Sequence, residues 1–247
     1  PPAILQDLEQ PVAPPLAAGW YNRLKSHHFE AYHAVANEFG ALIDIDPWLV
    51  DPYFGVCGEI NFQERAGEEC LASNVDWLLG RIRAKYDEYG IDEKPFVIVK
   101  ADAGTYGMGI MTVRDASEVQ GLNRKQRNKM AVVKEGLEVT SVIIQEGVPT
   151  YEAINEAIAE PVVYMIDRYV VGGFYRVHAA RGRDENLNAP GAQFVPLAFE
   201  SPCIPDLGGP AGCPPNRFYA YGVVARLAQV AAAIEVEQLS ERGAGAA

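Results

Sequence analysis

The feature that most constrains the fold is a glycine-rich loop enclosed by two short apolar segments, together spanning residues 96–113. Phe96–Val99 is a continuous, mostly β-branched run that is typical of a buried strand. After the loop, Ile110–Val113 predicts a second strand. Because the glycines lead back into a strand and not into a helix, the loop matches neither a Walker P-loop nor a dinucleotide-binding fingerprint. The segment predicts two strands joined by a pliable loop.

The residues of this loop suit an anionic ligand. Gly104, Gly107 and Gly109 can bring backbone N–H groups close to phosphate oxygens, which side chains would otherwise block. Lys100 places a positive charge where the first strand ends. A glycine-rich flap between antiparallel strands covers the nucleotide in ATP-grasp ligases and in protein kinases. The segment alone is equally compatible with a generic hairpin with tight turns, so both interpretations stay open at this point.

The rest of the chain predicts helices and strands of mostly antiparallel type. Apolar spacings of three and four residues predict helices over 21–42 and 68–89, the second ended by Gly90. Residues 43–67 show no clean period, so we expect irregular structure there. The other predicted elements are helices at 123–129, 152–159 and 217–239, a strand at 142–145, a β-hairpin over 161–178 with its turn near Asp167-Arg168 or Gly172-Gly173, and an extended segment at 194–199.

A second candidate site lies in the predicted hairpin and the loop after it. Five cationic or potentially cationic residues fall within sixteen positions: Arg168, Arg176, His178, Arg181 and Arg183. Arginine binds phosphate and carboxylate through paired hydrogen bonds. A lone arginine on a strand is usually solvated or in a salt bridge, but the grouping favours an anion site. His178 by itself is better explained as a packing or hydrogen-bonding residue than as a base.

The overall charge limits the class of partners. The chain has 247 residues, of which 49% are hydrophobic, enough for one substantial core or two modest lobes. The 33 acidic residues exceed the 21 basic ones and give a formal net charge of −12. This balance argues against a nucleic-acid-binding surface, which needs clustered Lys and Arg. An anionic substrate would need a local basic site.

Cysteine usage and hydropathy bear on the compartment. The four cysteines, Cys57, Cys70, Cys203 and Cys213, show no C-x-x-C spacing, so we expect free thiols, with zinc ligation or a disulfide as the less favoured alternatives. No stretch approaches the ~20 apolar residues of a membrane span, and no signal peptide opens the chain. We therefore expect a cytoplasmic protein with no membrane partner.

The ordered motifs resemble bacterial glutathione synthetase and, more closely, the proteobacterial glutamate–cysteine ligase family. The segments that carry the resemblance are KADAGTYGMGIMTV, EPVVYMIDRYVVGGFYRVH, ENLNAPG and NRFYAYGVVARLA, and it extends over residues 4–237. The resemblance implies an α/β fold with two ATP-grasp-like lobes, made of mostly antiparallel sheets flanked by helices. The implied parts are a connector and helical part over 1–94, a small lobe with the flap over 95–150, and a large lobe over 151–247.

The resemblance also implies roles for individual residues. Two would act on the reacting phosphate: Lys100, in contact with the ATP phosphates, and Arg176, which would stabilise charge on the transferred γ-phosphoryl group or the acyl phosphate. The phosphate lid would consist of Gly104, Thr105, Gly107 and Gly109. The adenine pocket would be lined by Gln145, Glu146 and Val148. Near the phosphates or the metals would lie Asn186 and Asn188.

The implied reaction is the ATP- and Mg²⁺-dependent joining of the glutamate γ-carboxylate to cysteine through γ-glutamyl phosphate, the first step of glutathione synthesis. Phosphoryl transfer of this kind needs positioning and charge neutralisation, without a protein nucleophile. One feature departs from the ATP-grasp pattern, because the last fifty residues lack the usual metal-binding Glu-x-Asn pair. The metal ligands are therefore unassigned, with Glu185, Glu200 and Glu235-x-Glu237 as candidates.

Two other functions stay open. The first is another ATP-grasp ligase with different amino-acid substrates, which a substrate panel would distinguish. The second is a non-catalytic nucleotide-binding module, which predicts ATP binding without turnover. The family carries an additional N-terminal region, and we expect this chain, which begins Pro1-Pro2, to be a piece without it. The sequence does not indicate an oligomeric state.

Overall fold

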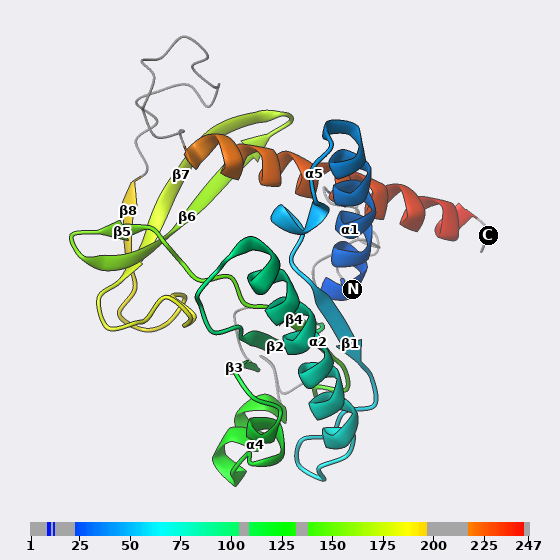
Figure 1. The fold of residues 1–247 in the computed structure, drawn as a ribbon. Coiled ribbons are helices and arrows are strands. Elements are labelled where there is room, and N and C mark those ends of the chain that lie inside the picture. Colours follow the sequence, from blue (N-terminus) through cyan, green and yellow to red (C-terminus); the bar gives the residue numbers. More distant parts are fainter. Residues whose placement is uncertain are drawn as a thin grey trace. The chain divides into compact units, whose positions relative to one another are not determined.

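The computed structural model describes residues 9–10, 12, 23–103, 109–131, 138–196 and 217–244, with the side chains of 217–219 and 240–244 left aside. Its ribbon is drawn in Figure 1. The chain forms two compact units, one comprising Pro1–Val148 with Ala231–Ala247 and the other Pro149–Val230. The predicted three-part division at 1–94, 95–150 and 151–247 stays a prediction.

The first unit contains a four-stranded antiparallel sheet with the strand order β1-β4-β2-β3. Its strands are β1 (Phe54–Cys57), β2 (Val97–Ala101), β3 (Ile110–Val113) and β4 (Val142–Glu146). The three strands predicted on either side of the loop and at 142–145 are confirmed. The prediction of irregular structure over 43–67 was wrong for β1, because a short edge strand is defined by its pairing with β4 and not by its own pattern.

One face of this sheet packs against α2 (Glu68–Tyr89), which lies alongside it in Figure 1. The helix was predicted with these bounds, and Gly90 ends it in the left-handed conformation at φ +64°. Alternate residues of β2, namely Val97, Val99 and Ala101, are buried in one core with the apolar face of the helix. By the period of two in a strand, Ile98 and Lys100 point to the other face.

Further helical elements complete the first unit. They are α1 (Lys25–Ile43), the 3₁₀ turn η3 (Pro47–Leu49), α3 (Ser117–Gln120) and α4 (Arg124–Ala131). The helices predicted at 21–42 and 123–129 are confirmed as α1 and α4. Asn123 and Gln126 begin α4 with a reciprocal capping box, in which each side chain accepts a hydrogen bond from the backbone N–H of the other, at 3.0 and 2.8 Å.

The second unit is built on another four-stranded antiparallel sheet, with the order β5-β6-β7-β8. The strands are β5 (Ala153–Ile154), β6 (Ala157–Ile166), β7 (Tyr169–His178) and β8 (Gln193–Pro196). The predicted hairpin is confirmed, with its turn at Asp167-Arg168, while Gly172 and Gly173 lie inside β7. The helix predicted at 152–159 was wrong: these residues form β5 and the start of β6 because pairing with β7 outweighs local helical preference.

The last element, α5 (Arg217–Ala244), confirms the helix predicted at 217–239 and contributes residues to both units. The extended segment predicted at 194–199 is seen as β8 as far as residue 196, and residues 197–199 lie outside the described part. The expected α/β fold, with antiparallel sheets and flanking helices, is confirmed. None of the helices described is long and apolar enough to cross a membrane.

Candidate functional site

Lys100 and Gln145, predicted to bind different parts of a nucleotide, lie together on the sheet of the first unit. Ile98 is directly opposite Gln145 in the β2–β4 register, and Lys100 follows two residues later on the same face. The Lys100 Nζ donates a hydrogen bond of 2.5 Å to the Gln145 Oε1. This bond positions the ammonium group on the face of the sheet that turns away from α2.

Gly109 is the one lid residue that the structure describes, since Gly104, Thr105 and Gly107 lie outside the described residues. Its carbonyl accepts the Ala101 N–H at 3.2 Å, which closes the base of the loop between β2 and β3. The backbone of Gly109 has a φ of +62°, a conformation that side-chain-bearing residues rarely adopt. The glycine is therefore required where the chain leaves the loop and enters β3.

The other end of this loop is anchored by the first turn of α1. Asp102 is buried, and its carboxylate accepts the Ser26 N–H at 2.8 Å and the Ser26 hydroxyl at 2.7 Å. The Lys25 Nζ donates to the carbonyls of Ala101, Asp102 and Ala103 at 2.7, 3.1 and 3.3 Å. Burial lowers the pKa of Lys25, partly offset by the charge of Asp102. Sequence reasoning missed these residues because the partners are 76 to 78 positions apart.

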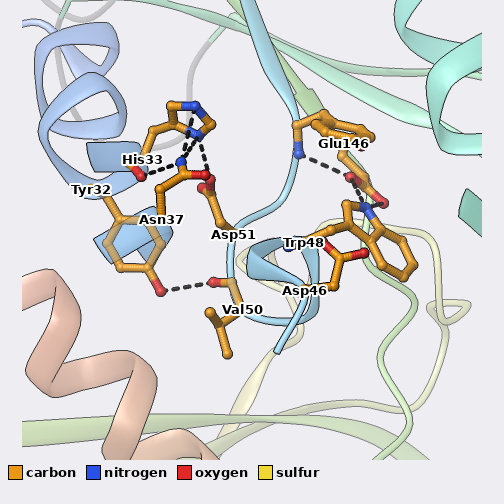
Figure 2. A network of polar contacts seen from close by, with 9 residues as sticks. Tyr32, His33, Asn37, Asp46, Trp48, Val50, Asp51 and Glu146 are labelled. Atoms are coloured by element: carbon orange, nitrogen blue, oxygen red, sulfur yellow. Dashed lines mark hydrogen bonds and ion pairs between the residues drawn. The ribbon is translucent and has the colours of Figure 1, made fainter. Parts of the chain in front are cut away.

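Glu146 follows Gln145 on β4, and its side chain points to the opposite face, toward Trp48 (Figure 2). The carboxylate accepts the Trp48 indole N–H at 3.0 Å and the Tyr53 backbone N–H at 2.9 Å. Burial raises the pKa of Glu146, and the hydrogen bonds from Tyr53 and Trp48 partly oppose that rise. The side chain therefore serves as an acceptor that holds residues 48–53 against β4. Its predicted place in an adenine pocket stays a prediction.

Replacing Glu146 by glutamine should flatten the pH dependence of stability. A carboxyl whose folded pKa lies above its unfolded value of about 4.3 makes the folded state most favourable below that pH. Its contribution is then lost as the pH rises through the folded pKa, at up to about 1.4 kcal/mol per pH unit. Urea unfolding of Glu146→Gln between pH 4.5 and 7 should show a shallower decline than the parent protein. Identical pH profiles would contradict the assigned burial effect.

The segment that Glu146 holds, residues 48–53, is also bound to α1 (Figure 2). The buried Asp51 lies 2.5 Å from the His33 Nδ1, and the Tyr32 hydroxyl donates to the Val50 carbonyl at 2.8 Å. Burial raises the pKa of Asp51, while the hydrogen bond from His33 opposes the rise. Burial, with the nearby Asp51 charge, also raises the pKa of Tyr32 to about 12. These groups stabilise the segment that precedes β1.

The two residues after Glu146 differ in their surroundings. The Gly147 N–H donates to the Phe96 carbonyl at 2.8 Å, and the Phe96 ring occupies the space where a Gly147 side chain would lie. Val148 has an exposed fraction of 65%. The end of β4 therefore combines a closely packed glycine with an exposed apolar side chain that is available to a ligand.

In the second unit, Arg176 lies on β7, which is paired with β6 on one side and β8 on the other. The register places it between Glu160 on β6 and Phe194 on β8. Its Nη1 donates to the Glu160 Oε1, and its Nε is buried without a hydrogen-bond partner among the described residues. The Arg176 side chain has an exposed fraction of 22%. A half-buried guanidinium with one ion-pair partner keeps further N–H donors and is suited to bind an oxyanion.

The five cations grouped in the sequence are not all close together in the structure. Arg168 stands in the turn just before β7, eight residues from Arg176 and therefore about 26 Å away along the strand. The Arg168 side chain is exposed, 3.9 Å from Asp167 and over the Tyr169 ring. Arg168 is thus no part of an anion site around Arg176.

The other three cationic residues, at the end of β7 and in the loop after it, each contact nearby groups of the chain. His178 is buried; its Nδ1 accepts the Ala180 N–H at 3.2 Å, so its Nε2 carries the proton donated to the Pro190 carbonyl at 3.1 Å. These two hydrogen bonds fit the predicted hydrogen-bonding role. Arg181 pairs with Glu185 at 2.8 Å. Arg183 donates to the Thr150 carbonyl at 3.2 Å and lies over the Tyr151 ring.

Asn186 and Asn188 are both exposed and lie in one turn. The Asn186 Oδ1 accepts the Asn188 N–H at 2.9 Å, while Leu187 between them is fully buried. The turn thus presents two amide side chains on the surface of the second unit. Lys100 and Gln145 belong to the first unit, and Arg176, Asn186 and Asn188 to the second. That all five face one nucleotide stays a prediction.

The candidate metal ligands are engaged elsewhere. Glu235 lies in α5, where it binds Arg23 and accepts from the His28 Nδ1 at 2.9 Å. The Glu185 carboxylate accepts the Gly182 N–H at 2.7 Å, and this bond, with Arg181, lowers its pKa. Glu200 is outside the described residues. Within the described part of the chain, no three His, Cys, Asp or Glu side chains converge to hold a metal ion.

Comparison with known proteins adds independent findings. The family model of glutamate–cysteine ligase matches residues 1–236. A solved structure from Methylobacillus flagellatus KT, provisionally assigned as a gamma-glutamylcysteine synthetase, is 65% identical and superposes with a TM-score of 0.85. The match covers 96% of this chain and 56% of that one, so the chain spans little more than half the length of its solved relative. No curated protein matches the chain.

Proposed function

The chain belongs to the glutamate–cysteine ligase family, and on this premise we propose that it supplies the nucleotide-binding part of an enzyme that joins glutamate to cysteine. ATP would phosphorylate the glutamate γ-carboxylate, and the cysteine amine would displace the phosphate. The reaction is the first step of glutathione synthesis. The fold proposed for the chain is that of an ATP-grasp ligase.

The observation that carries the proposal is the position of Lys100. Lys100 lies on β2, the strand that enters the glycine-rich loop, and Gln145 of β4 holds its ammonium group. Gly109 closes the base of that loop. Charge-assisted hydrogen bonds from such a group to phosphate oxygens are stronger than those between neutral groups. Lys100 would therefore bind and orient the phosphates, and exposed Val148 would contact the adenine base.

Arg176 would neutralise the charge that develops during phosphoryl transfer. Its partner Glu160 holds the Nη1 of the guanidinium from the neighbouring strand, and the exposed part of the group would donate its remaining N–H groups to an oxygen of the phosphoryl group. Asn186 and Asn188 offer exposed amides near the end of the same sheet for further phosphate contacts. No protein nucleophile is needed, since positioning and charge stabilisation account for most of the catalysis of phosphoryl transfer.

A magnesium ion, when bound, would supply positive charge that neutralises the phosphate oxygens. The described residues do not fit a protein-made metal cage, because Glu185 and Glu235 are both engaged in internal contacts. We therefore assign no ligand to the metal, and the roles given to Lys100 and Arg176 do not depend on one.

The proposed activity is tested by incubating the protein with glutamate, cysteine and ATP. ADP and γ-glutamylcysteine should form in equal amounts, and ADP should not form when either amino acid is omitted. A panel of other amines and carboxylates separates this ligase from one with different substrates. A folded protein that binds ATP but yields neither ADP nor dipeptide would instead be a nucleotide-binding module, the candidate favoured by the lack of a converging metal cluster in the described residues.

Replacing Lys100 by alanine should weaken ATP binding by about 2–3 kcal/mol, or roughly 30- to 150-fold in Kd, because a charged hydrogen bond to phosphate is lost. Isothermal titration with a non-hydrolysable ATP analogue measures the change. Lys125→Ala is the matched control, since Lys125 is an exposed residue of α4 and the change removes the same charge. Equal affinity in the Lys100→Ala and control variants would remove Lys100 from the site.

A further inference from the structure

Two cysteines that the proposed reaction does not use lie in contact in the first unit. Cys57 is the last residue of β1, and Cys70 lies in the first turn of α2. Their Sγ atoms are 3.8 Å apart, and both thiols are free. Cys57 is buried with an exposed fraction of 2%, whereas Cys70 is exposed. Cys70 is thus accessible to a reagent in solution, and the buried Cys57 sulfur lies within 3.8 Å of the Cys70 sulfur.

Asn74 holds the pair in this arrangement. It lies one helical turn after Cys70, and its Nδ2 donates to the Cys70 carbonyl at 3.0 Å. The same amide nitrogen lies 3.0 Å from the Cys57 Sγ and 3.5 Å from the Cys70 Sγ. Burial raises the pKa of Cys57 by more than the hydrogen bond from Asn74 lowers it. The contribution of Asn74 to the site is therefore to hold the two sulfurs together.

We propose that Cys57 and Cys70 are a redox modification site, at which a low-molecular-weight disulfide such as glutathione disulfide converts the two thiols into an internal disulfide. A disulfide bond is about 2.05 Å long, so the sulfurs must approach by roughly 1.8 Å. Side-chain rotation can supply this movement because Cys57 is the last residue of β1 and Cys70 lies in the first turn of α2. The proposal is independent of the ligase function.

The chemistry proceeds by two thiol–disulfide exchanges. The Cys70 thiol loses its proton, and the thiolate attacks one sulfur of glutathione disulfide; a mixed disulfide forms, and one glutathione thiolate leaves and takes up the proton. Deprotonated Cys57 then attacks the Cys70 sulfur and releases the second glutathione. Two protein thiols are oxidised, and one disulfide is reduced to two thiols. Burial raises the pKa of Cys57 to about 11, so the second exchange should accelerate as the pH rises.

The new bond would link the edge strand β1 to α2 and close the connection formed by residues 58–69. Closing a chain loop lowers the entropy of the unfolded state and so stabilises the fold. The buried Cys57 would also protect Cys70, since an internal disulfide forms in place of the irreversible oxidation products of an exposed thiol. Glutathione or another thiol reverses the change.

The experiment uses the purified protein with Cys203 and Cys213, which lie outside the described residues, replaced by serine. The protein is incubated with glutathione disulfide at pH 8 and analysed by intact mass and by non-reducing peptide mapping. Both thiols should disappear, no glutathione should remain attached, and one cross-linked peptide should contain Cys57 and Cys70. The apparent Tm should rise by several degrees and return to its starting value after dithiothreitol.

Single variants test the order of the two steps. Cys57→Ser should stop at a stable glutathione adduct on Cys70, and Cys70→Ser should react at least tenfold more slowly because the remaining thiol is buried. Circular dichroism confirms that each variant is folded, and the urea-unfolded parent confirms that the reagent is active. Unchanged thiols, a lasting glutathione adduct on the parent, or disulfide-linked dimers would each overturn the proposal.

Discussion

Replacing Arg176 by alanine is expected to lower kcat of the ligase reaction by about 10³-fold, the lower end of what a charge-stabilising arginine contributes to phosphoryl transfer. The guanidinium is held by Glu160 from the neighbouring strand, so it needs little reorganisation when charge develops on the phosphoryl oxygens. Because such an interaction strengthens in the transition state, KM for ATP should change far less than kcat. Steady-state kinetics with ADP release as the readout measures both constants.

Two further variants separate catalysis from folding. Arg176→Lys keeps the charge but lacks the planar fork, so it should recover only a small part of the activity. Glu160→Gln retains an acceptor for the Arg176 Nη1 and should lose much less activity than Arg176→Ala. Thermal melting checks that all three variants are folded. An Arg176→Ala protein that is folded and turns over at nearly the parent rate would show that Arg176 has a structural role only.

Replacing Gly147 by alanine should lower the free energy of unfolding by about 3 kcal/mol, the upper end of the usual cost of overpacking a core. A Cβ built on Gly147 would lie 2.0 Å from the Phe96 Cε2 and 2.1 Å from its Cδ2. Such distances are impossible, so the ring or the end of β4 must shift. The Gly147 N–H bonds the Phe96 carbonyl, which holds the two backbones close and limits relaxation. Chemical denaturation followed by circular dichroism measures the loss.

Gly80→Ala is the matched control for this substitution, with the opposite expected sign. Gly80 is exposed within α2, and nothing lies within 4 Å of the Cβ that would be added. Alanine favours a helix interior over glycine by about 1 kcal/mol, so the control should stabilise the protein. If Gly147→Ala proves as stable as the parent, Phe96 does not fill the space beside the end of β4 as the structure shows.

The sequence by itself predicted the elements whose signals are local. The periodic apolar residues of α2 and the glycine after it determine both ends of that helix, because helix formation depends on neighbours three and four positions apart. The apolar runs at β2, β3 and β4 and the hairpin of β6 and β7 were predicted for a similar reason. Lys100 and Arg176 were identified as candidates because they lie in short segments that resemble the family.

Only the tertiary structure decided which distant residues meet. The strand β1 exists through its pairing with β4, and Gln145 orients Lys100 from 45 positions away. Glu146 directs its carboxylate to Trp48, 98 positions distant, and Cys57 meets Cys70 across the start of a helix. No local pattern encodes these contacts, because each depends on how a strand face or a helix turn is placed by the packing of the whole unit. The candidate residues for the chemistry could be found in the sequence from their residue types. The residues that contact them could be found only in the folded structure, because long-range packing brings them together.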